Sequence, residues 1–389
     1  MFVKMNNLFV KISVFFEKKK KTLFNCNVKM QTDYLKKLGK PNDDIERSFF
    51  QYKCQKKLNG ILLSAIYNIF SFPLIFIYII KYYSKEASVS SKLCYDAVFF
   101  RDGKPSNILP SSLRKKFEKI QISPVENIKF ANTDIKFIKM LIKKYPFSYY
   151  FILKCLIKIG KYRYAIDTYA PKAIIVCAEF SFTSSLLTAY CNMSDIFHIN
   201  IMHGEKLFYM RDSFFHFDNC YVWDEYYKEL FVSLGAEKNQ FVVEVPESLK
   251  MVFDKKCDKL YDFTYYLGSE TTSELERISS SLKLLCINGF SVSVRPHPRY
   301  SNLEYIYKMF DFANVEDSKT LSIEQSLANT NSVISLYSTV LNQALNSNIE
   351  IIIDDITNID HYNKLFELKY ICLKKHHKLL SDVLNDLNK

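Results

Sequence analysis

The chain has 389 residues, a formal net charge of +12 and 48% hydrophobic residues, and 15% of its residues are aromatic. This length exceeds that of one ordinary core and predicts two domains, while the apolar content excludes a disordered chain. The ten cysteines show no zinc-type spacing and several lie in apolar runs, which predicts reduced thiols in a cytoplasmic protein and no disulfide framework.

The first unusual segment is residues 58–80, which contain no charged residue and are flanked by Lys56, Lys57 and Lys81. Its length suits a bilayer span, whereas Pro73 near its middle favours a broken helix that enters one leaflet. A helical hairpin buried against the first domain is the third interpretation. Because basic residues lie on both flanks, we expect residues 1–93 to associate with the cytoplasmic face of the bacterial inner membrane, with Pro73 at the turn of a shallow re-entrant segment.

Residues 94–250 alternate apolar runs with helical patterns, as expected of an acceptor-binding Rossmann-like domain. Strands are predicted at 94–100, 173–178, 197–202, 219–223 and 241–245. Helices are predicted at about 134–160, 162–169, 182–191 and 225–234. Apolar runs separated by helices indicate a parallel sheet covered on both faces. The polar segment 246–260 is the predicted linker.

Residues 251–389 repeat this alternation and are expected to form a nucleotide-sugar-binding domain. Strands are predicted at 262–267, 290–295, 332–336 and 349–353, and helices at 271–285 and 376–388. Two doubly wound α/β halves predict a ligand cleft between them at the carboxyl ends of the strands. The sequence lacks the glycine-rich dinucleotide, P-loop and nucleophile-elbow motifs, which disfavours an oxidoreductase, a P-loop enzyme and an α/β-hydrolase.

Three short motifs follow predicted strands. In the first, Arg101-Asp102-Gly103, the carboxylate can take a proton from a sugar hydroxyl, although an Asp beside a turn Gly is also a common structural feature. The second surrounds one histidine with two prolines and two arginines, which suits binding or protonation of a leaving phosphate better than packing; it comprises Arg295, Pro296, His297, Pro298 and Arg299. The third, Ser338-Thr339, precedes a helix and predicts an anion site, with simple helix capping as the alternative.

In this order, the three motifs resemble those of the bacterial sialyltransferases of GT-B fold, over roughly residues 94–346. The resemblance implies that Asp102 is the base, that His297 assists departure of CMP, and that Ser338 and Thr339 hold its phosphate. It also implies a nucleotide contact for Glu324. One departure is Arg101, which stands where the family has an acid and would lower the pKa of Asp102, weakening it as a base.

A fourth motif, His203-Gly204-Glu205, follows the predicted strand 197–202. Together with the later HP and Ser-rich motifs, it is similar to the teichoic-acid and capsule transferases that use CDP-glycerol. That resemblance implies that His203, and not Asp102, is the base. Bacterial Kdo transferases share the HP-plus-Ser arrangement, and all three interpretations agree on a CMP- or CDP-type donor.

We therefore expect an inverting sialyltransferase that moves sialic acid from CMP-sialic acid to a lipid-linked oligosaccharide. The alternatives are a CDP-glycerol- or Kdo-type transferase and a non-catalytic capsule-assembly scaffold. No nucleic-acid-binding motif is present, so no nucleic acid is expected as a partner. Neither a metal nor another cofactor is expected, because the histidines lack ligand spacing and GT-B enzymes generally neutralise the leaving phosphate with side chains and helix ends.

Overall fold

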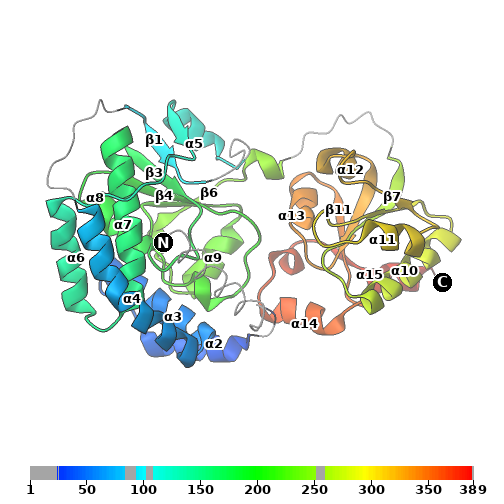
Figure 1. Ribbon diagram of the computed structural model, residues 1–389. Helices are drawn as coiled ribbons and strands as arrows, with labels where there is room; N and C mark the ends of the chain where they lie inside the picture. Colours follow the sequence, from blue (N-terminus) through cyan, green and yellow to red (C-terminus); the bar gives the residue numbers. More distant parts are fainter. Residues whose placement is uncertain (1–23, 25, 84–92, 102–107, 251–258, 388–389) are drawn as a thin grey trace. The chain divides into compact units, whose positions relative to one another are not determined.

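The computed structural model describes residues 24, 26–83, 93–101, 108–250 and 259–387. The chain divides into two compact units. The first contains most of residues 1–243, and the second contains residues 244–389 together with the short segments 106–111 and 203–207. Each unit is built on one six-stranded parallel sheet with helices around it (Figure 1). The predicted α/β class with two Rossmann-like domains is confirmed.

The sheet of the first unit has the strand order β2-β1-β3-β4-β5-β6, and all of its pairs are parallel. Its strands are β1 Ala97–Phe99, β2 Ile120–Ile122, β3 Ala173–Val176, β4 Phe197–Ile201, β5 Asn219–Val222 and β6 Phe241–Val243. The central strands are buried, because helices cover both faces of a parallel sheet. Strand β2 was not predicted, since three half-buried residues give too short an apolar pattern.

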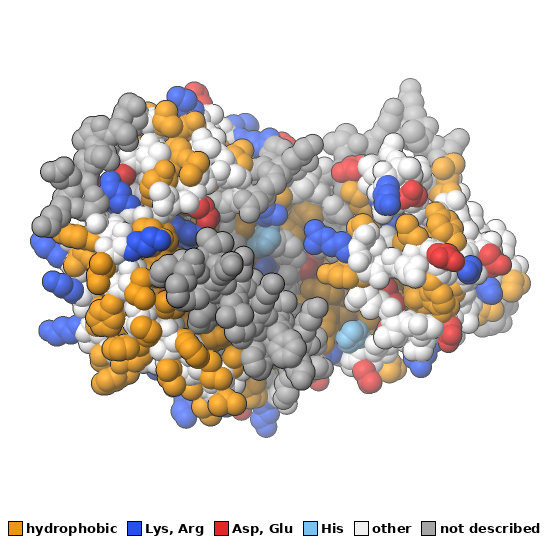
Figure 2. Space-filling model, in the orientation of Figure 1, with side chains coloured by type: hydrophobic (Ala, Val, Ile, Leu, Met, Phe, Trp, Pro, Cys, Tyr) orange, Lys and Arg blue, Asp and Glu red, His pale blue; other side chains and the backbone are white. Residues whose placement is uncertain are grey.

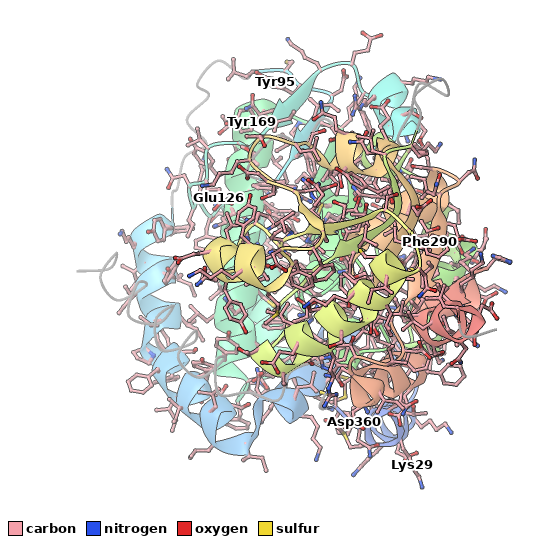
Figure 3. All side chains as sticks on the ribbon, turned by 90° about the vertical axis from the view of Figure 1, so that its right-hand side faces the viewer. Lys29, Tyr95, Glu126, Tyr169, Phe290 and Asp360 are labelled. Atoms are coloured by element: carbon pink, nitrogen blue, oxygen red, sulfur yellow. The ribbon has the colours of Figure 1, made fainter. Side chains whose placement is uncertain are left out.

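The described part of the first unit contains eight α-helices and two short 3-10 turns. The α-helices are α2 Val28–Leu38, α3 Asp44–Asn59, α4 Ile61–Tyr82, α5 Ser111–Lys116, α6 Asn132–Lys144, α7 Tyr149–Tyr169, α8 Ser184–Asn192 and α9 Glu225–Ser233, and the 3-10 turns are η3 Met210–Asp212 and η4 Lys238–Gln240. The long helix α7 packs on the sheet, where Tyr169 meets Tyr95 edge-on at a ring-centroid distance of 5.7 Å (Figure 3).

The helix boundary predicted near residue 161 is wrong. Helix α6 ends at Lys144, and α7 then runs without interruption from Tyr149. Pro146 explains the position of the break, because proline disfavours the α conformation of the residue before it. Tyr145 accordingly leaves the helical region, with φ −134° and ψ 58°.

Helix α3 is attached to the rest of the first unit by hydrogen bonds of its side chains. Gln51 donates to the backbone carbonyls of Glu179 and Arg211, both at 2.9 Å. Arg47 donates to the carbonyl of Gly235 at 3.2 Å, and the hydroxyl of Ser48 accepts from a backbone amide of α8. These bonds satisfy buried polar groups, so α3 is an integral layer of the unit.

The re-entrant turn expected at Pro73 is also wrong. Helix α4 continues through Pro73 as one helix of 22 residues. Its actual break lies before it, at Gly60, where φ is +86° and separates α4 from α3. Proline costs a helix one amide donor, but α4 is packed along α7 on both sides of Pro73, and this packing outweighs the local preference. Among the described residues, α4 is the one helix long and apolar enough to cross a membrane.

The sheet of the second unit has the order β12-β11-β10-β7-β8-β9, again fully parallel. Its strands are β7 Tyr261–Tyr266, β8 Val292–Arg295, β9 Asn314–Val315, β10 Thr330–Ser335, β11 Glu350–Ile353 and β12 Lys378–Leu379. Its helices are α10 Thr272–Ile287, α11 Leu303–Met309, α12 Ile323–Ala328, α13 Thr339–Asn346, α14 Ile359–Glu367 and α15 Leu380–Asp386. The predicted helix 376–388 begins later, because residues 378–379 pair with β11.

Candidate active site

The strand order of the second unit determines where a ligand can bind. Read from β9, the order is third, second, first, fourth, fifth and sixth strand of the unit, as in doubly wound nucleotide-binding domains. The direction of winding reverses between β7 and β10, and ligands bind such sheets at the carboxyl ends of the strands beside that reversal. The two strands are joined there by the Ser335 hydroxyl, which donates to the carbonyl of Tyr266 at 3.0 Å.

The HP motif leaves the carboxyl end of β8, the strand next to β7. The backbone amide of Arg299 donates to Nδ1 of His297 at 3.1 Å, and the amide of His297 donates to Ser301 at 2.9 Å. An amide can only donate, so Nδ1 is the unprotonated nitrogen and Nε2 carries the proton. Burial lowers the pKa of His297, and the charge of Arg299 lowers it further. The imidazole is therefore neutral at pH 7 and offers Nε2–H as a donor.

The same loop is exposed on one side. His297 is half-buried and stacks on Tyr300 with 4.5 Å between ring centroids, while Pro298 and Arg299 are exposed. The ring is stacked and accepts one hydrogen bond at Nδ1, and the backbone amide of the same residue is bound to Ser301, so the imidazole has little rotational freedom. Arg299 adds a positive charge beside it, as binding of a phosphate requires.

Arg295 lies inside the domain and not on its surface. Its guanidinium forms an ion pair with Glu316 at 2.9 Å and donates to the carbonyl of Leu321 at 2.8 Å. Glu316 also accepts from the hydroxyl of Ser326 at 2.6 Å. Arg295 was predicted to contact the donor directly, whereas these bonds attach the end of β8, and with it the HP loop, to the segment that leads into α12.

Ser338 follows β10, on the other side of β7, and caps helix α13. Its hydroxyl oxygen accepts from the amide of Val340 at 3.3 Å, and its carbonyl accepts from Tyr370 at 3.4 Å. The hydroxyl proton remains available to an anion, as do amides of the first helical turn. Thr339 is the exposed first residue of α13. Both predicted roles, cap and anion donor, are thus compatible in Ser338.

Glu270, which sequence reasoning missed, lies after β7 between these two loops. Its carboxylate accepts from the amide of Gly268 with both oxygens, at 2.7 and 2.8 Å. Burial raises the pKa of Glu270, and the carboxylates of Glu274 and Asp354 raise it further, while the Gly268 amide lowers it. The amide of Gly268 in the turn after β7 is thus occupied by a carboxylate of the same turn. In the sequence, Glu270 is an acidic residue three positions after the predicted strand 262–267, and this pattern is too common to indicate a site.

The His203-Gly204-Glu205 segment belongs to the second unit. Gly204 has φ +84°, a conformation that favours glycine. The side-chain amide of Asn342, on helix α13, donates to the Glu205 carboxylate. The segment therefore lies against the helix that Ser338 caps, and the half-buried His203 is two residues from this contact.

The acidic motif belongs to the first unit, and only Arg101 is described; Asp102 and Gly103 lie outside the described residues. Arg101 follows β1 and donates to the sulfur of Cys177 after β3 at 3.4 Å. In the order β2-β1-β3-β4-β5-β6 the winding reverses between β1 and β3, so Arg101 stands at the switch point of its own sheet. Sequence reasoning missed Glu179 here, a buried carboxylate that accepts from Asn200 at 3.1 Å.

The structure thus brings the HP loop, the Gly268 turn and the Ser338 turn to three neighbouring strands. Since adjacent strands lie about 4.8 Å apart, β8 and β10 are separated by roughly 10 Å. Glu324, the predicted nucleotide contact, is exposed in the first turn of α12. Within the described ranges, no three His, Cys, Asp or Glu side chains are grouped as metal ligands would be.

Fold and site together define an α/β protein with two Rossmann-like domains and a set of hydrogen-bond donors at the carboxyl ends of β8 and β10 in the second sheet. No family model matches the sequence, nor does any curated protein. Among solved structures, UDP-N-acetylglucosamine 2-epimerase from Rickettsia bellii is 13% identical, with a TM-score of 0.41 over 67% of this chain and 78% of that one. The wall teichoic acid polymerase TagF is 11% identical, with a TM-score of 0.42 over 87% of this chain and 88% of that one. S. aureus MnaA with UDP is 10% identical, with a TM-score of 0.44 over 66% and 78%. At such identities and TM-scores, these likenesses assign no activity to this chain.

Proposed function

We propose that this chain is an inverting glycosyltransferase that uses a nucleotide-activated donor. The observation that carries the proposal is the pair of hydrogen-bond donors on the strands flanking β7. His297 offers Nε2–H from the end of β8, and Ser338 offers its hydroxyl and the amides of α13 from the end of β10. Both are neutral donors with a positive helix end or an arginine beside them, which suits a phosphate that gains negative charge as it leaves.

The proposed reaction is a single displacement. An acceptor hydroxyl forms a bond to the anomeric carbon of the donor sugar, while the bond from that carbon to the donor phosphate oxygen breaks. The nucleotide phosphate leaves with the bonding electrons, held by His297 and Ser338. A base takes the hydroxyl proton, and the configuration inverts. The candidates for that base are Asp102 and His203.

The finer proposal follows the motif resemblance and names CMP-sialic acid as donor. The proposed acceptor is a galactose-type hydroxyl of a lipid-linked O-antigen or capsule oligosaccharide, met at the cytoplasmic face of the inner membrane. No metal or other cofactor enters the proposal, because the donors named above supply the charge stabilisation.

One observation favours the second candidate, a CDP-glycerol-type transferase. Glu205 is bonded to Asn342 of α13, which brings the His203 segment to the helix that Ser338 begins. A histidine anchored beside the donor-binding helix is well situated to act as base. Both candidates share the cytidine-phosphate chemistry and differ in the transferred group and in the base.

A donor panel tests the proposal. Purified full-length protein is heated with CMP-Neu5Ac, CMP-Kdo, CDP-glycerol or a UDP-sugar, and the shift of the unfolding midpoint is measured. Hydrolysis and transfer to a lipid-linked acceptor are then followed. One cytidine donor should stabilise the protein, since a ligand that binds only the native state raises its stability. Stabilisation by UDP-sugars alone would exclude the cytidine assignment. No stabilisation and no turnover with any donor would support a non-catalytic scaffold.

A further inference from the structure

Helix α4 has the reverse of the usual distribution of side chains. Every exposed position between residues 61 and 80 carries Ile, Leu, Phe, Ala or Pro. The most exposed large ones are Ile61 (85%), Ile80 (79%), Leu62 (77%), Ile69 (69%), Phe70 (57%) and Phe76 (53%). Figure 2 shows these hydrophobic side chains gathered on one face of the first unit. A surface helix of a water-soluble domain normally presents polar residues outward.

Between residues 61 and 80, no polar side chain of α4 is exposed. Ser64, Tyr67, Ser71 and Tyr78 lie on the stripe that faces the domain. The two serine hydroxyls donate to backbone carbonyls one turn earlier, at 2.7 and 2.6 Å, so they are satisfied within the helix. The exposed face is therefore more apolar than the buried face, as expected when the surroundings of that face are lipid.

The helix is held against α7 along its length. The Asn68 amide donates to the carbonyl of Phe147 at 2.8 Å and accepts from the amide of Tyr150 at 3.1 Å. Tyr67 stacks on Tyr150 with 5.2 Å between ring centroids. Phe147, brought beside α4 by the Asn68 bond, is itself 78% exposed. The apolar surface thus extends beyond one helix, and α4 is a fixed part of the unit.

Exposed cations border this surface. They stand at the end of α3, at the end of α4 and along α6, and are Lys56, Lys57, Lys81, Lys136, Lys139 and Lys143. Helices α4, α6 and α7 lie side by side (Figure 1). The one acidic residue within α4 and α6 is Asp134, which is buried and paired with Arg163. Helices α4 and α6 thus expose no carboxylate, and a surface that is basic at its edge and apolar at its centre matches an anionic bilayer.

We propose that α4 lies in the plane of an anionic membrane, with its outer face among the headgroups and upper acyl chains of one leaflet, and does not cross it. With 22 residues and about 1.5 Å per residue it is long enough to span a bilayer. Crossing would require removal of the buried side chains Leu63, Tyr67, Ile75 and Tyr78 from the domain, and Tyr67 would lose its stacking on Tyr150. In-plane binding keeps this packing and needs no refolding. The inference is independent of the proposed chemistry and concerns only where the protein works.

Vesicle flotation of the full-length protein tests the surface. The test variant is Ile61→Ser/Ile69→Ser/Ile80→Ser, and the matched control is Ile287→Ser/Ile359→Ser/Phe366→Ser, whose three sites are equally apolar and exposed on the second unit. Wild type and control should float with phosphatidylglycerol vesicles and remain bound in high salt, whereas the test variant should lose binding at least tenfold. Equal binding by the test variant and the wild type would overturn the proposal. The proposal would also be overturned if the wild type did not bind vesicles but formed a dimer, and the test variant were monomeric. The apolar face would then bind a second copy of the chain.

A depth measurement distinguishes an in-plane helix from a span. Trp223 is the single tryptophan, so Trp223→Phe gives a background for one reporter at a time. Ile61→Trp, Ile69→Trp and Ile80→Trp place reporters at both ends and near the middle of α4. Lipids brominated near the headgroup should quench all three equally and more strongly than lipids brominated near the chain end. Deep quenching at position 69 with shallow quenching at 61 and 80 would show a span and overturn the proposal. Circular dichroism and an unchanged unfolding midpoint establish that each variant is folded.

Discussion

Arg295 and Glu316 form a buried ion pair, with 2.9 Å between the guanidinium and the carboxylate and both side chains less than a tenth exposed. The pair connects the end of β8 to the segment before α12, and the HP loop begins one residue after Arg295. The position of His297 therefore depends on a buried ion pair within the domain.

We expect Arg295→Met to destabilise the protein by about 3–5 kcal/mol, because it leaves the Glu316 carboxylate buried without its cation. The double variant Arg295→Met/Glu316→Leu should recover much of this loss. Denaturant unfolding measures both. Lys308→Met, in the exposed pair with Glu304, is the control and should change stability by less than about 0.5 kcal/mol. A loss from Arg295→Met as small as that of the control would contradict the structural role of the pair.

His297→Ala should reduce transfer roughly 100-fold or more with a normal unfolding midpoint, because that is the usual contribution of one positioned hydrogen-bond donor to a developing negative charge. The exposed His376→Ala is the matched control and should retain full activity. Activity of His297→Ala within a few-fold of wild type would remove this residue from the mechanism.

The pH profile tests the protonation state of His297. Burial and Arg299 lower its pKa below the ordinary value of about 6.5, so the neutral form is the main one at neutral pH and persists into mildly acid solution. Protonation of Nδ1 would place a proton against the Arg299 amide that now donates to it. We therefore expect kcat/KM to stay level from neutral pH to about pH 6.5 and to fall only below that, through the lowered pKa. A kcat/KM that rises as pH falls through this range would mean that the imidazolium is the active form.

Ser338 is expected to act both as a cap and as a phosphate donor, and two substitutions separate these roles. Ser338→Ala removes the helix cap, so it should destabilise the protein by about 1 kcal/mol. It also removes the hydroxyl that donates to the phosphate, so it should weaken donor binding. Ser338→Asp keeps the cap, since aspartate accepts from the same amide, but repels a phosphate. The aspartate variant should thus be as stable as wild type and bind the cytidine donor at least tenfold more weakly. Wild-type donor affinity in the aspartate variant would reduce Ser338 to a cap.

The base is assigned by comparing Asp102→Ala with His203→Ala in the transfer assay. The sialyltransferase proposal requires Asp102→Ala to be nearly inactive, with His203→Ala affected mainly through donor KM. The CDP-glycerol proposal requires the opposite ranking, with kcat lost in His203→Ala. Asn342→Asp tests the anchoring of the His203 segment, because it sets a second carboxylate against Glu205. It should lower activity if the CDP-glycerol proposal is correct. If the sialyltransferase proposal is correct, activity should stay within a few-fold of wild type.

Local sequence determined the α/β class and most of the strands. Runs such as residues 173–176 and 351–353 are apolar throughout, because a parallel strand covered on both faces has no polar side to interrupt them. The HP and Ser338 motifs were equally visible, since prolines and a capping serine act on the backbone beside them. Two-residue edge strands such as β9 and β12 carry no such pattern, and they went unpredicted.

Tertiary contacts decided the remainder. Pro73 predicts a broken helix from its missing amide alone, yet packing against α7 on both sides keeps α4 continuous. Arg295 looks like a ligand-binding arginine until Glu316, 21 residues later, is found beside it. The strand order that brings the loops of β7, β8 and β10 together depends on pairings between segments far apart in the chain. Short-range preferences are encoded within a few residues, whereas partners in space are chosen by burial and charge across the whole domain, and the chemistry of this site depends on those partners.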